Sequence, residues 1–206
     1  MIIKISKSKL KDIQKETPYY WMGQNKVPGI VGRPQKAIIE LLQEGKITGN
    51  VLVIGDKTGD NALTLAKNGL KVLGIHTSPN IMLKASREAD RRGLDIEFLI
   101  DDSLEINSID KKFDVVFDAG FFHNLSESEA LWFAIKLKRF LYKGGKYFIT
   151  CFSNDMSGFK GARGISREEI YRTFRDGWEI ESIKEIDITT TFEDVKGWLV
   201  EVIRMN

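Results

Sequence analysis

The sequence predicts an α/β fold in which helices alternate with the strands of a mostly parallel sheet. From residue 34 onward, helical patterns alternate with short β-branched runs, at spacings that suit strand–helix–strand units. The expected strands are 51–55, 71–75, 96–100, 113–118 and 145–151. After Trp178, two further β-like stretches, 179–189 and 198–204, follow one another with no helix between them. These two stretches should form an antiparallel pair at one edge of the sheet.

Residues that commonly begin or end helices fall where this alternation needs them. Gly69 and Gly93 stand where a helix should stop in the left-handed conformation, and Ser78 precedes a proline at the first helical position. Two serine–glutamate pairs have the spacing of capping boxes: Ser126 with Glu129, and Ser166 with Glu169. The helices that they open should run to about Leu141 and about Phe174.

Size, charge and cysteine usage favour one domain that acts on small molecules. The 206 residues suffice for a single core without disulfides or metals, so we expect one domain over 1–206. The formal net charge is only +2, which gives no field suited to nucleic acid or an anionic membrane. The single cysteine, the absence of a signal-peptide pattern and the lack of a long apolar run predict a soluble, cytoplasmic protein, monomeric or homodimeric.

The first 33 residues differ from the rest and should form a cover over the α/β core of 34–206. Tyr19, Tyr20 and Trp21 cluster among polar residues, and glycines and prolines interrupt any long periodicity. Two interpretations remain open. The segment is either a helix packed on the sheet edge with its aromatic side chains as anchors, or a lid over a site.

A glycine-bearing turn follows the first strand of the alternating series. The stretch NVLVIGDKTGDNALTLAKNG is a strand, a turn and a helix, the arrangement that binds nucleotide-like ligands at the carboxyl ends of strands. Gly55 and Gly59 allow the tight turn, and the helix that begins near Asp60 should aim free backbone N–H groups at an anionic group. The next strand, KVLGI, leads to His76, where dinucleotide folds place a ribose-binding acid.

Five segments together resemble the class I S-adenosylmethionine-dependent methyltransferases. VLVIGDKTGDNALTLAKNGLKVLGIHTSP is similar to the first two motifs of that family, IEFLIDDSLEI to the third, FDVVFDAGFFHNL to the fourth and LYKGGKYFITCFSN to the strand-five motif. GRPQKAIIELL and ISREEIYRTFRDGWEIESI resemble its small-molecule branch, with thiopurine, tellurite and halide methyltransferase relatives. The resemblance implies a Rossmann-like, doubly wound sheet of seven strands with an antiparallel last strand, and a small-molecule acceptor.

The resemblance also assigns cofactor-binding positions for S-adenosylmethionine. They comprise the turn after the first strand, the end of the second strand, the acid that holds the adenine amino group with its neighbour, the fourth motif and the upstream arginine. In this sequence they are Gly55, Asp56, Lys57, Thr58, Gly59, His76, Thr77, Asp102, Ser103, Asp118 and Arg33. The planar fork of Arg33 suits a carboxylate of the cofactor or the substrate. A surface loop role for Arg33 is the alternative.

Four departures from the family's pattern fall on the cofactor site and weaken the case for cofactor binding. Val53 replaces the acid at the end of the first strand, and Lys57 replaces the middle glycine of the turn. His76 replaces the ribose-binding acid. This replacement should weaken ribose binding by about one charge-assisted hydrogen bond, roughly 1.5–3 kcal/mol. Gly29-Ile30 replaces an upstream Trp-Asp pair.

Methyl transfer from a sulfonium needs few catalytic residues, because the leaving group is already activated. His123 is the best candidate for a general base, and Asp118 could touch the cofactor or the acceptor. An ordinary loop histidine and a turn-capping aspartate are the respective alternatives. Four aromatic residues form either an acceptor pocket or, as we favour for most of them, core: Phe121, Phe122, Trp132 and Phe133. Cys151 should be a buried small hydrophobe, and no set of residues has metal-ligand spacing.

Three functions compete on these observations. The leading one is a methyltransferase that uses S-adenosylmethionine on a small molecule. The second is a methyltransferase-like protein that has lost productive cofactor binding and serves as a binding or regulatory module, which the four departures favour. The third is an enzyme for a nucleotide-like or phosphorylated ligand held by Lys57 and Thr58, although Asp56 next to them opposes anion binding.

Overall fold

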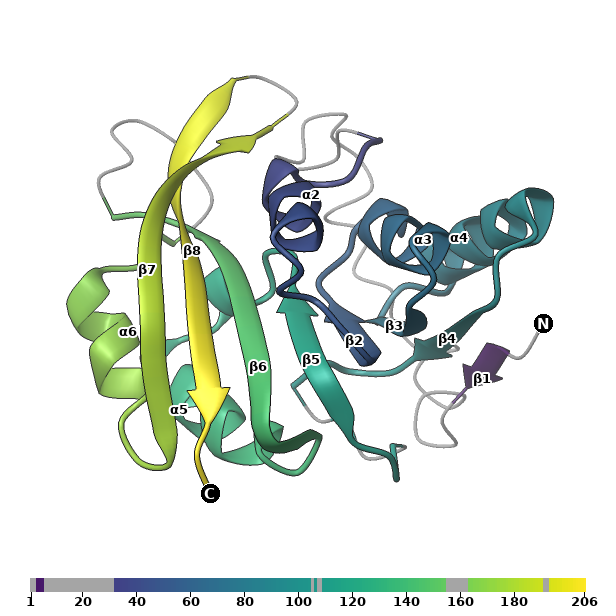
Figure 1. Cartoon of the computed structure of the whole chain (residues 1–206). Coiled ribbons are helices and arrows are strands. Elements are labelled where there is room, and N and C mark those ends of the chain that lie inside the picture. Colours follow the sequence, from purple (N-terminus) through teal and green to yellow (C-terminus); the bar gives the residue numbers. More distant parts are fainter. Residues whose placement is uncertain (1–2, 6–31, 105, 107–108, 155–162, 191–192) are drawn as a thin grey trace, which may run out of the picture.

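The protein is built on one mixed β-sheet with helices on both faces (Figure 1). The computed structural model describes residues 3–5, 32–104, 106, 109–154, 163–190 and 193–206. Its eight strands lie in the order β1-β4-β3-β2-β5-β6-β8-β7. Their bounds are Ile3–Ile5 for β1, Asn50–Ile54 for β2, Lys71–His76 for β3, Ile96–Ile100 for β4, Phe113–Asp118 for β5, Leu141–Phe152 for β6, Trp178–Thr189 for β7 and Asp194–Arg204 for β8.

The predicted fold class is confirmed. Strands β1 to β6 pair in parallel, and β8 runs antiparallel to both of its neighbours, β6 and β7. All seven expected strands are present as β2 to β8, and the antiparallel pair lies at one edge of the sheet as expected. The three-residue strand β1, which pairs with β4 at the opposite edge, adds an eighth. It is too short to carry a periodicity signal.

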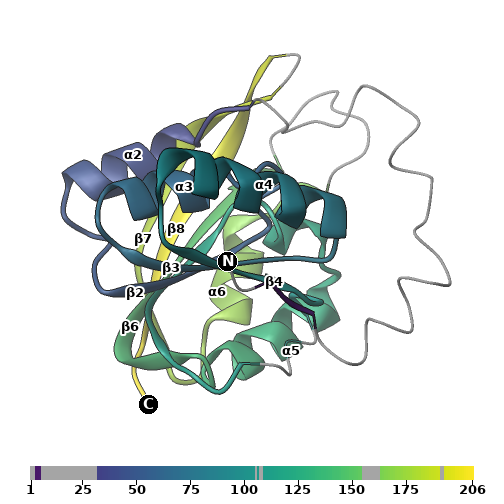
Figure 2. The same cartoon turned by 90° about the vertical axis from the view of Figure 1, so that its right-hand side faces the viewer.

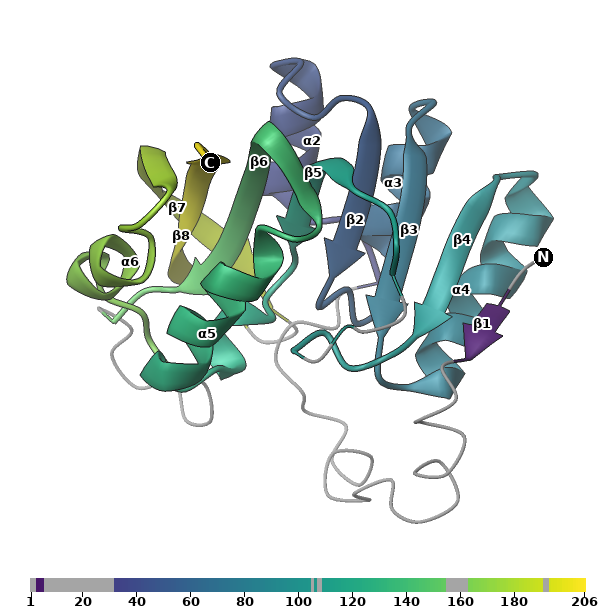
Figure 3. The same cartoon turned by 90° about the horizontal axis from the view of Figure 1, so that it is seen from below.

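Helices cover the two faces of the sheet unequally (Figures 2 and 3). Helices α2, α3 and α4 lie on one face, and α5 and α6 lie on the other. Their bounds are Lys36–Gln43 for α2, Asp60–Lys67 for α3, Pro79–Arg92 for α4, Glu127–Leu137 for α5 and Arg167–Thr173 for α6. An apolar cluster lies on each face of the sheet, and alternate residues of β2 belong to different clusters. Val51 and Val53 pack under α2 to α4, whereas Leu52 and Ile54 face α5 and α6.

The helix ends follow several of the predicted signals, although the Ser78 side chain makes no capping hydrogen bond at α4. Gly69 and Gly93 have positive φ angles of 82° and 65° at the ends of α3 and α4, and Ser126 forms a complete capping box with Glu129. At α6 the Ser166 hydroxyl accepts the Glu169 N–H, but the Glu169 carboxylate pairs with Arg163 and does not return to the cap.

The prediction that the helix opened by Ser126 runs to about Leu141 is wrong, because α5 ends at Leu137. Leu141 begins β6, where it pairs with Phe113 of β5 and is fully buried. The pairing of Leu141 with β5 therefore ends the helix four residues before the expected end.

The strand register brings several loops to one edge of the sheet. Ile54 of β2 lies beside Ile75 of β3 and Asp118 of β5, and His76 lies beside Ile100 of β4. The loops after β2, β3, β4 and β5 therefore leave the sheet at the same edge, as expected for a ligand-binding crevice in an α/β sheet. The expected N-terminal cover and the Gly29-Ile30 departure lie outside the described residues, except for 3–5 and 32–33.

A buried carboxylate ties β8 to distant parts of the chain. Glu201 has a side chain only 3% exposed, and its two oxygens lie 2.7 Å from the ammonium groups of Lys46 and Lys146. Burial opposes its ionisation, but the hydrogen bonds from the two lysines outweigh burial and lower the pKa of Glu201. The ion triad therefore joins β8 to β6 and to the segment after α2.

Neither a membrane-spanning helix nor a metal-binding cluster is present in the part of the chain that the structure describes. No helix in this part of the chain is long and apolar enough to cross a membrane. Within the same residues, no group of three or more histidine, cysteine, aspartate or glutamate side chains is placed to hold a metal ion.

Candidate active site

Both outer glycines of the turn after β2 are required by packing. Gly55 has φ 72°, and a Cβ atom there would lie 2.7 Å from the Phe121 backbone nitrogen. Gly59 has φ 80°, and its Cβ would lie 2.4 Å from the Ala85 side chain of α4. Lys57 does not share this requirement, because no described non-glycine residue has a positive φ. The lysine that replaces the middle glycine therefore sits in the turn without backbone strain.

Asp56 caps helix α3 from within the turn. Its carboxylate is buried and accepts hydrogen bonds from the Gly59 N–H (3.1 Å), the Ala62 N–H (3.0 Å) and the Asn61 amide (3.2 Å). The Asp60 N–H donates to the Thr58 hydroxyl at 3.3 Å. Burial raises the pKa of Asp56, although these hydrogen bonds oppose the rise.

The expectation that α3 aims free N–H groups at an anion is therefore wrong for these donors. The chain's own Asp56 and Thr58 side chains already accept from the first turn. The hypothesis of a phosphorylated ligand at this helix terminus therefore lacks physical support.

His76 presents different chemistry from the acid that it replaces. It ends β3, and its Nδ1 accepts a hydrogen bond from the Ser78 backbone N–H at 2.9 Å. The neutral ring therefore carries its proton on Nε2, which is a donor. Where the family's carboxylate accepts from ribose hydroxyls, His76 can donate to one. Thr77 beside it is exposed.

Two adjacent aspartates follow β4, and the sequence analysis identified only one of them. Asp102 is half-buried, and its Oδ1 accepts from the Leu104 N–H at 2.9 Å. Asp101 is 5% exposed; its Oδ1 accepts from the Asp102 N–H, and its Oδ2 is buried with no hydrogen-bond partner among the described residues. Ser103 is buried beside them. An unpartnered buried carboxylate oxygen is costly, so this loop needs a donor.

Asp118 is a turn cap and does not line the pocket. It is fully buried at the end of β5 and accepts from the N–H groups of Gly120 (2.9 Å), Phe121 (2.5 Å) and Phe122 (3.1 Å). The Tyr147 hydroxyl donates to its Oδ2 at 2.7 Å. Burial raises the pKa of Asp118 to about 7, although the four hydrogen-bond donors act to lower it. With its oxygens occupied, the predicted catalytic or cofactor-binding role is corrected to the structural alternative.

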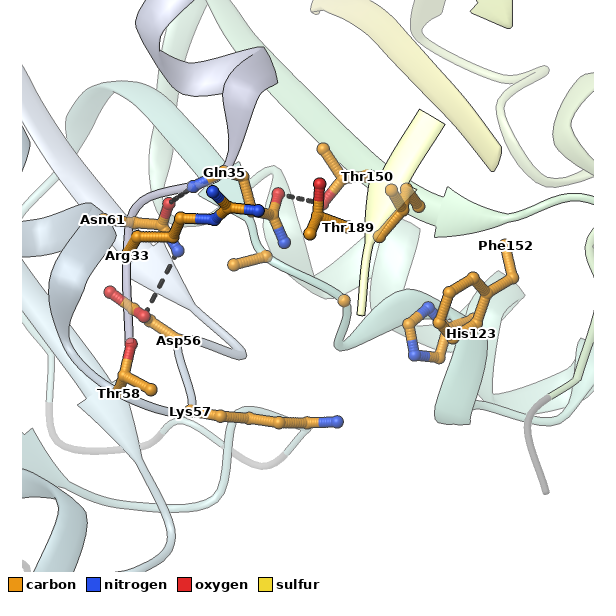
Figure 4. A pocket seen from close by; sticks show the side chains of 13 residues that line it. Arg33, Gln35, Asp56, Lys57, Thr58, Asn61, His123, Thr150, Phe152 and Thr189 are labelled. Carbon is orange, nitrogen blue, oxygen red and sulfur yellow. Dashed lines mark hydrogen bonds between the residues drawn. The ribbon is translucent and has the colours of Figure 1, made fainter. Parts of the chain in front are cut away.

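A pocket opens where the loops after β2 and β5 meet the start of α2 (Figure 4). It is lined by Arg33, Gln35, Asp56, Lys57, Thr58, Asn61, Ala119, Gly120, His123, Thr150, Phe152, Ile188 and Thr189. The structure thus brings five predicted site residues together here: Arg33, Asp56, Lys57, Thr58 and His123.

A hydrogen-bond network that sequence reasoning missed holds the wall of this pocket. The Gln35 N–H donates to the Asn61 side-chain oxygen at 2.9 Å, and the Asn61 amide in turn donates to Asp56. On the other side, the Thr150 hydroxyl lies 2.7 Å from the Gln35 side-chain oxygen and 2.9 Å from the Asp118 carbonyl. The GRPQ segment is thereby fastened to both α3 and β6.

His123 lines the pocket, and its surroundings disfavour the expected role as a base. It lies in a short 3-10 turn, Phe122–Asn124, is 6% exposed, and stacks on Phe152 at a ring separation of 4.6 Å. Its Nδ1 is buried with no hydrogen-bond partner among the described residues. Burial, and then the charges of Lys57 and Arg163, lower its pKa to about 3. A group with so low a pKa is a weak proton acceptor at neutral pH.

Lys57 reaches from the glycine turn along the pocket. In Figure 4 its side chain extends from the β2–α3 turn toward the side of the pocket that holds His123 and Phe152. Burial lowers the pKa of Lys57. Its charge is one of the two that lower the pKa of His123, so the two side chains belong to one electrostatic unit.

The aromatic residues proposed for an acceptor pocket do not line it. Phe122 and Phe133 are buried in the core, and Phe121 packs edge-on against Phe133 at 5.2 Å. Trp132 is 47% exposed on α5 under the Lys136 ammonium. Phe152 is the aromatic side chain that lines the pocket among the described residues.

Two further residues behave as ordinary core. Cys151 is fully buried, as predicted, and burial raises its thiol pKa well above the usual range. Val53 is fully buried and pairs with Gly74 and Phe117 of the neighbouring strands, where an unpaired acid would be costly to bury.

Comparisons with known proteins agree with this geometry. The family described as "Methyltransferase domain" matches residues 51–145. An uncharacterized methyltransferase of Schizosaccharomyces pombe is 31% identical over 115 residues, which cover 56% of this chain and 79% of that protein. A 2-heptyl-1-hydroxyquinolin-4(1H)-one methyltransferase of Mycobacteroides abscessus is 26% identical over 161 residues, or 76% of this chain and 70% of that one.

Solved structures share the fold over most of the chain. A structure concerned with the conversion of a disulfide bond into a thioacetal group during echinomycin biosynthesis superposes with a TM-score of 0.81 at 28% identity, covering 91% of this chain and 89% of that one. Magnesium protoporphyrin IX methyltransferase of Synechocystis, solved with bound S-adenosylhomocysteine, gives a TM-score of 0.65 at 19% identity, covering 82% and 80%. The latter likeness concerns the fold alone.

The predicted family and its cofactor, S-adenosylmethionine, are therefore confirmed, whereas the thiopurine, tellurite and halide branch stays a prediction. The ordered motifs, the sheet with its antiparallel last strand and the Schizosaccharomyces relative all agree. The chain belongs to the class I S-adenosylmethionine-dependent methyltransferases.

Proposed function

We propose that this protein methylates a small molecule that binds in the pocket bounded by Lys57 and His123. The observation that carries the proposal is the position of this pocket. One wall is the glycine-rich turn after β2, the family's cofactor turn, and the facing wall is the loop after β5 with its buried histidine. The mixed polar and apolar lining of the pocket suits a small organic acceptor.

The residues at the strand ends fit an adenosyl group. The unpartnered Oδ2 of Asp101 and the remaining oxygen of Asp102 are acceptors for an adenine amino group. The Nε2–H of His76 is a donor for a ribose hydroxyl oxygen. Arg33 and Lys57, which both line the pocket, carry side chains suited to a carboxylate.

S-adenosylmethionine supplies a methyl carbon on a sulfonium, so the chain's own residues have mainly a positioning task. The Gln35–Asn61–Asp56 network fixes the wall beside the turn. Phe152 and the stacked His123 present a flat surface to an acceptor and exclude water behind it. The Mycobacteroides relative is named for a hydroxylated quinolone, a planar small molecule, which supports an acceptor of that general kind.

Calorimetry with S-adenosylhomocysteine tests the proposal. We expect micromolar binding by the parent chain. Asp101→Asn replaces the unpartnered oxygen with an amide donor, and the loss of one charge-assisted hydrogen bond, about 1.5–3 kcal/mol, should weaken binding roughly 10- to 100-fold. The matched control is Asp90→Asn, which removes the same charge from an exposed position on α4.

Two results would contradict the proposal. If the parent chain shows no heat of binding at millimolar ligand, productive cofactor binding has been lost and the protein is a binding or regulatory module. If Asp101→Asn and Asp90→Asn bind equally well, Asp101 does not contact the adenine end.

A further inference from the structure

Helix α5 carries an apolar patch on its solvent side. Leu131, Trp132 and Ile135 are 40%, 47% and 69% exposed, and they lie on consecutive turns of the helix. Figure 3 shows α5 on the outside of the molecule beside α6. Single exposed apolar side chains are common on protein surfaces. Three large neighbours on one helix instead form a patch of the kind that contacts a partner.

The patch belongs to a ridge in which every fourth residue is exposed. Glu127, Leu131, Ile135 and Arg139 follow one another at intervals of four positions, and all four are exposed. The helical turn continues past the end of α5, because Lys138 keeps helical dihedral angles and the Arg139 N–H donates to the carbonyl three residues before it. Ridges of this spacing are the ones by which helices most often pack on one another.

The order of residues along this ridge is self-complementary. An acid stands at its start, two apolar residues occupy its middle and a base stands at its end. When a second copy of the ridge lies antiparallel across a two-fold axis, Glu127 faces the partner's Arg139, and Leu131 faces the partner's Ile135. A parallel arrangement sets acid against acid and base against base, which like-charge repulsion opposes. The sequence of the ridge therefore favours an antiparallel copy of itself.

The contacts beside the ridge are compatible with this arrangement. Trp132 flanks Leu131 and lies under the Lys136 ammonium, 4.4 Å from the ring centroid. Glu127 accepts a hydrogen bond from Arg172 of α6 at 2.8 Å, and both side chains are more than half exposed. A carboxylate has two oxygens and can accept from two guanidinium groups. The ion pair within the chain therefore leaves Glu127 able to bind a second arginine.

We propose that this ridge is a self-association surface, through which two copies of the chain pair by antiparallel α5 helices. The pairing removes the exposed parts of Leu131, Trp132 and Ile135 from water in both copies. A two-fold contact uses the same surface on both copies, so the assembly closes at two members. The pocket described above is lined by other elements and stays open in the dimer. The inference is therefore independent of which molecule is methylated.

Sedimentation equilibrium of the full chain measures this association. Because the patch is small, we expect a monomer–dimer equilibrium with a micromolar dissociation constant. Ile135→Glu places a charge at the centre of the contact and should abolish the dimer. Leu83→Glu is the matched control, because Leu83 is 39% exposed on α4. The control should keep the dissociation constant within about threefold of the parent's.

Charge reversal tests the antiparallel order. Arg139→Glu or Glu127→Lys alone sets like charges against each other, and each change acts twice in a two-fold dimer. The dissociation constant should therefore rise about tenfold. The double variant rebuilds both opposite-charge pairs in reverse and should restore most of the parental affinity. Arg87→Glu, at an exposed position on α4, controls for the change in net charge. Circular dichroism checks that each variant is folded.

Three results would overturn the inference. A parent chain that stays monomeric in the high-micromolar range leaves the α5 ridge to another segment of the chain or to a different protein. A dimer that tolerates Ile135→Glu forms through another surface. A double charge-reversal variant that associates no more tightly than the two single variants rules out the antiparallel order.

Discussion

Gln35 and Thr150 are joined by a 2.7 Å hydrogen bond although 115 residues separate them in the chain. The Thr150 hydroxyl is buried and also lies 2.9 Å from the Asp118 carbonyl. One side chain on β6 thus supports the GRPQ segment and the end of β5 together. The pocket wall depends on a contact between parts of the sequence that no local pattern connects.

Thr150→Val should reveal this dependence. The valine has a similar shape but no hydroxyl, so buried acceptors lose their donor, at a cost of about 1–3 kcal/mol in the free energy of unfolding. Urea unfolding followed by circular dichroism measures the change. Thr48→Val at an exposed position is the control and should change stability by less than about 0.5 kcal/mol. A stability loss no larger than that of Thr48→Val would show that the bond contributes nothing.

Tyr147→Phe should destabilise the fold through Asp118. The substitution keeps the buried ring and removes the hydroxyl that donates to the Asp118 carboxylate at 2.7 Å. A hydrogen bond to a charged group contributes about 1.5–3 kcal/mol, and the same loss is expected in urea unfolding at pH 8, where Asp118 is mostly ionised. Tyr142→Phe, at a 47% exposed residue, is the matched control. Equal stabilities of the two variants would rule out the proposed support of Asp118.

His123 should make the fold less stable in mild acid. Burial lowers its pKa from the usual 6.5 to about 3. Between these two pH values the unfolded chain binds a proton on His123 and the folded chain does not. The stabilising effect is complete above pH 6.5 and is lost as the pH falls toward 3, by about 1.4 kcal/mol per pH unit. Between pH 6.5 and 5 the loss is about 2 kcal/mol.

His123→Gln isolates this contribution. Urea unfolding at pH 6.5 and pH 5 should show a fall in stability that is about 2 kcal/mol smaller in the variant than in the parent. Burial raises the pKa of Asp118 to about 7, so Asp118 contributes with the opposite sign in both proteins and cancels in the comparison. Identical pH dependence in the two proteins would mean that His123 becomes protonated in the folded state.

His76→Asp, alone and with Lys57→Gly, should strengthen cofactor binding. The aspartate restores acceptors for the ribose hydroxyls, and one regained charge-assisted hydrogen bond corresponds to roughly a tenfold or larger gain in affinity. Calorimetry with S-adenosylmethionine measures both single variants and the double variant, because neighbouring sites can couple. Weaker binding by the double variant than by the parent would mean that the contacts of Lys57 and His76 with the cofactor contribute more to affinity than the regained acceptors do.

The sequence predicted the sheet well because its strands carry strong local signals. The expected ranges of β4 and β5 agree with the structure at both ends, since each is a short apolar run bounded by turn residues. The start of β6 was missed because Leu141 continues the apolar pattern of the preceding helix, and only its pairing with Phe113 reveals a strand. A local sequence pattern cannot reveal a strand-pairing partner that lies 28 residues earlier in the chain.

The site was predicted less completely, for a related reason. Lys57 and Arg33 were found because they stand in or near recognisable motifs, and both line the pocket. Asp118 accepts a hydrogen bond from Tyr147, and His123 stacks on Phe152. Both partners belong to β6, so the local sequence around Asp118 and His123 does not reveal these contacts. The partnerless oxygen of Asp101 was invisible in sequence, because it depends on which of two adjacent aspartates turns inward.

The Glu201 ion triad has a consequence for the order in which the chain acquires its structure during synthesis. Lys46 and Lys146 emerge from the ribosome long before Glu201, and β8 must then insert between β6 and β7. Until it does, β6 exposes an unpaired edge and two like charges face a vacant place in the sheet, a combination that discourages premature closure and invites pairing with foreign strands. The sheet can therefore close only after the residues of β8 have been synthesised.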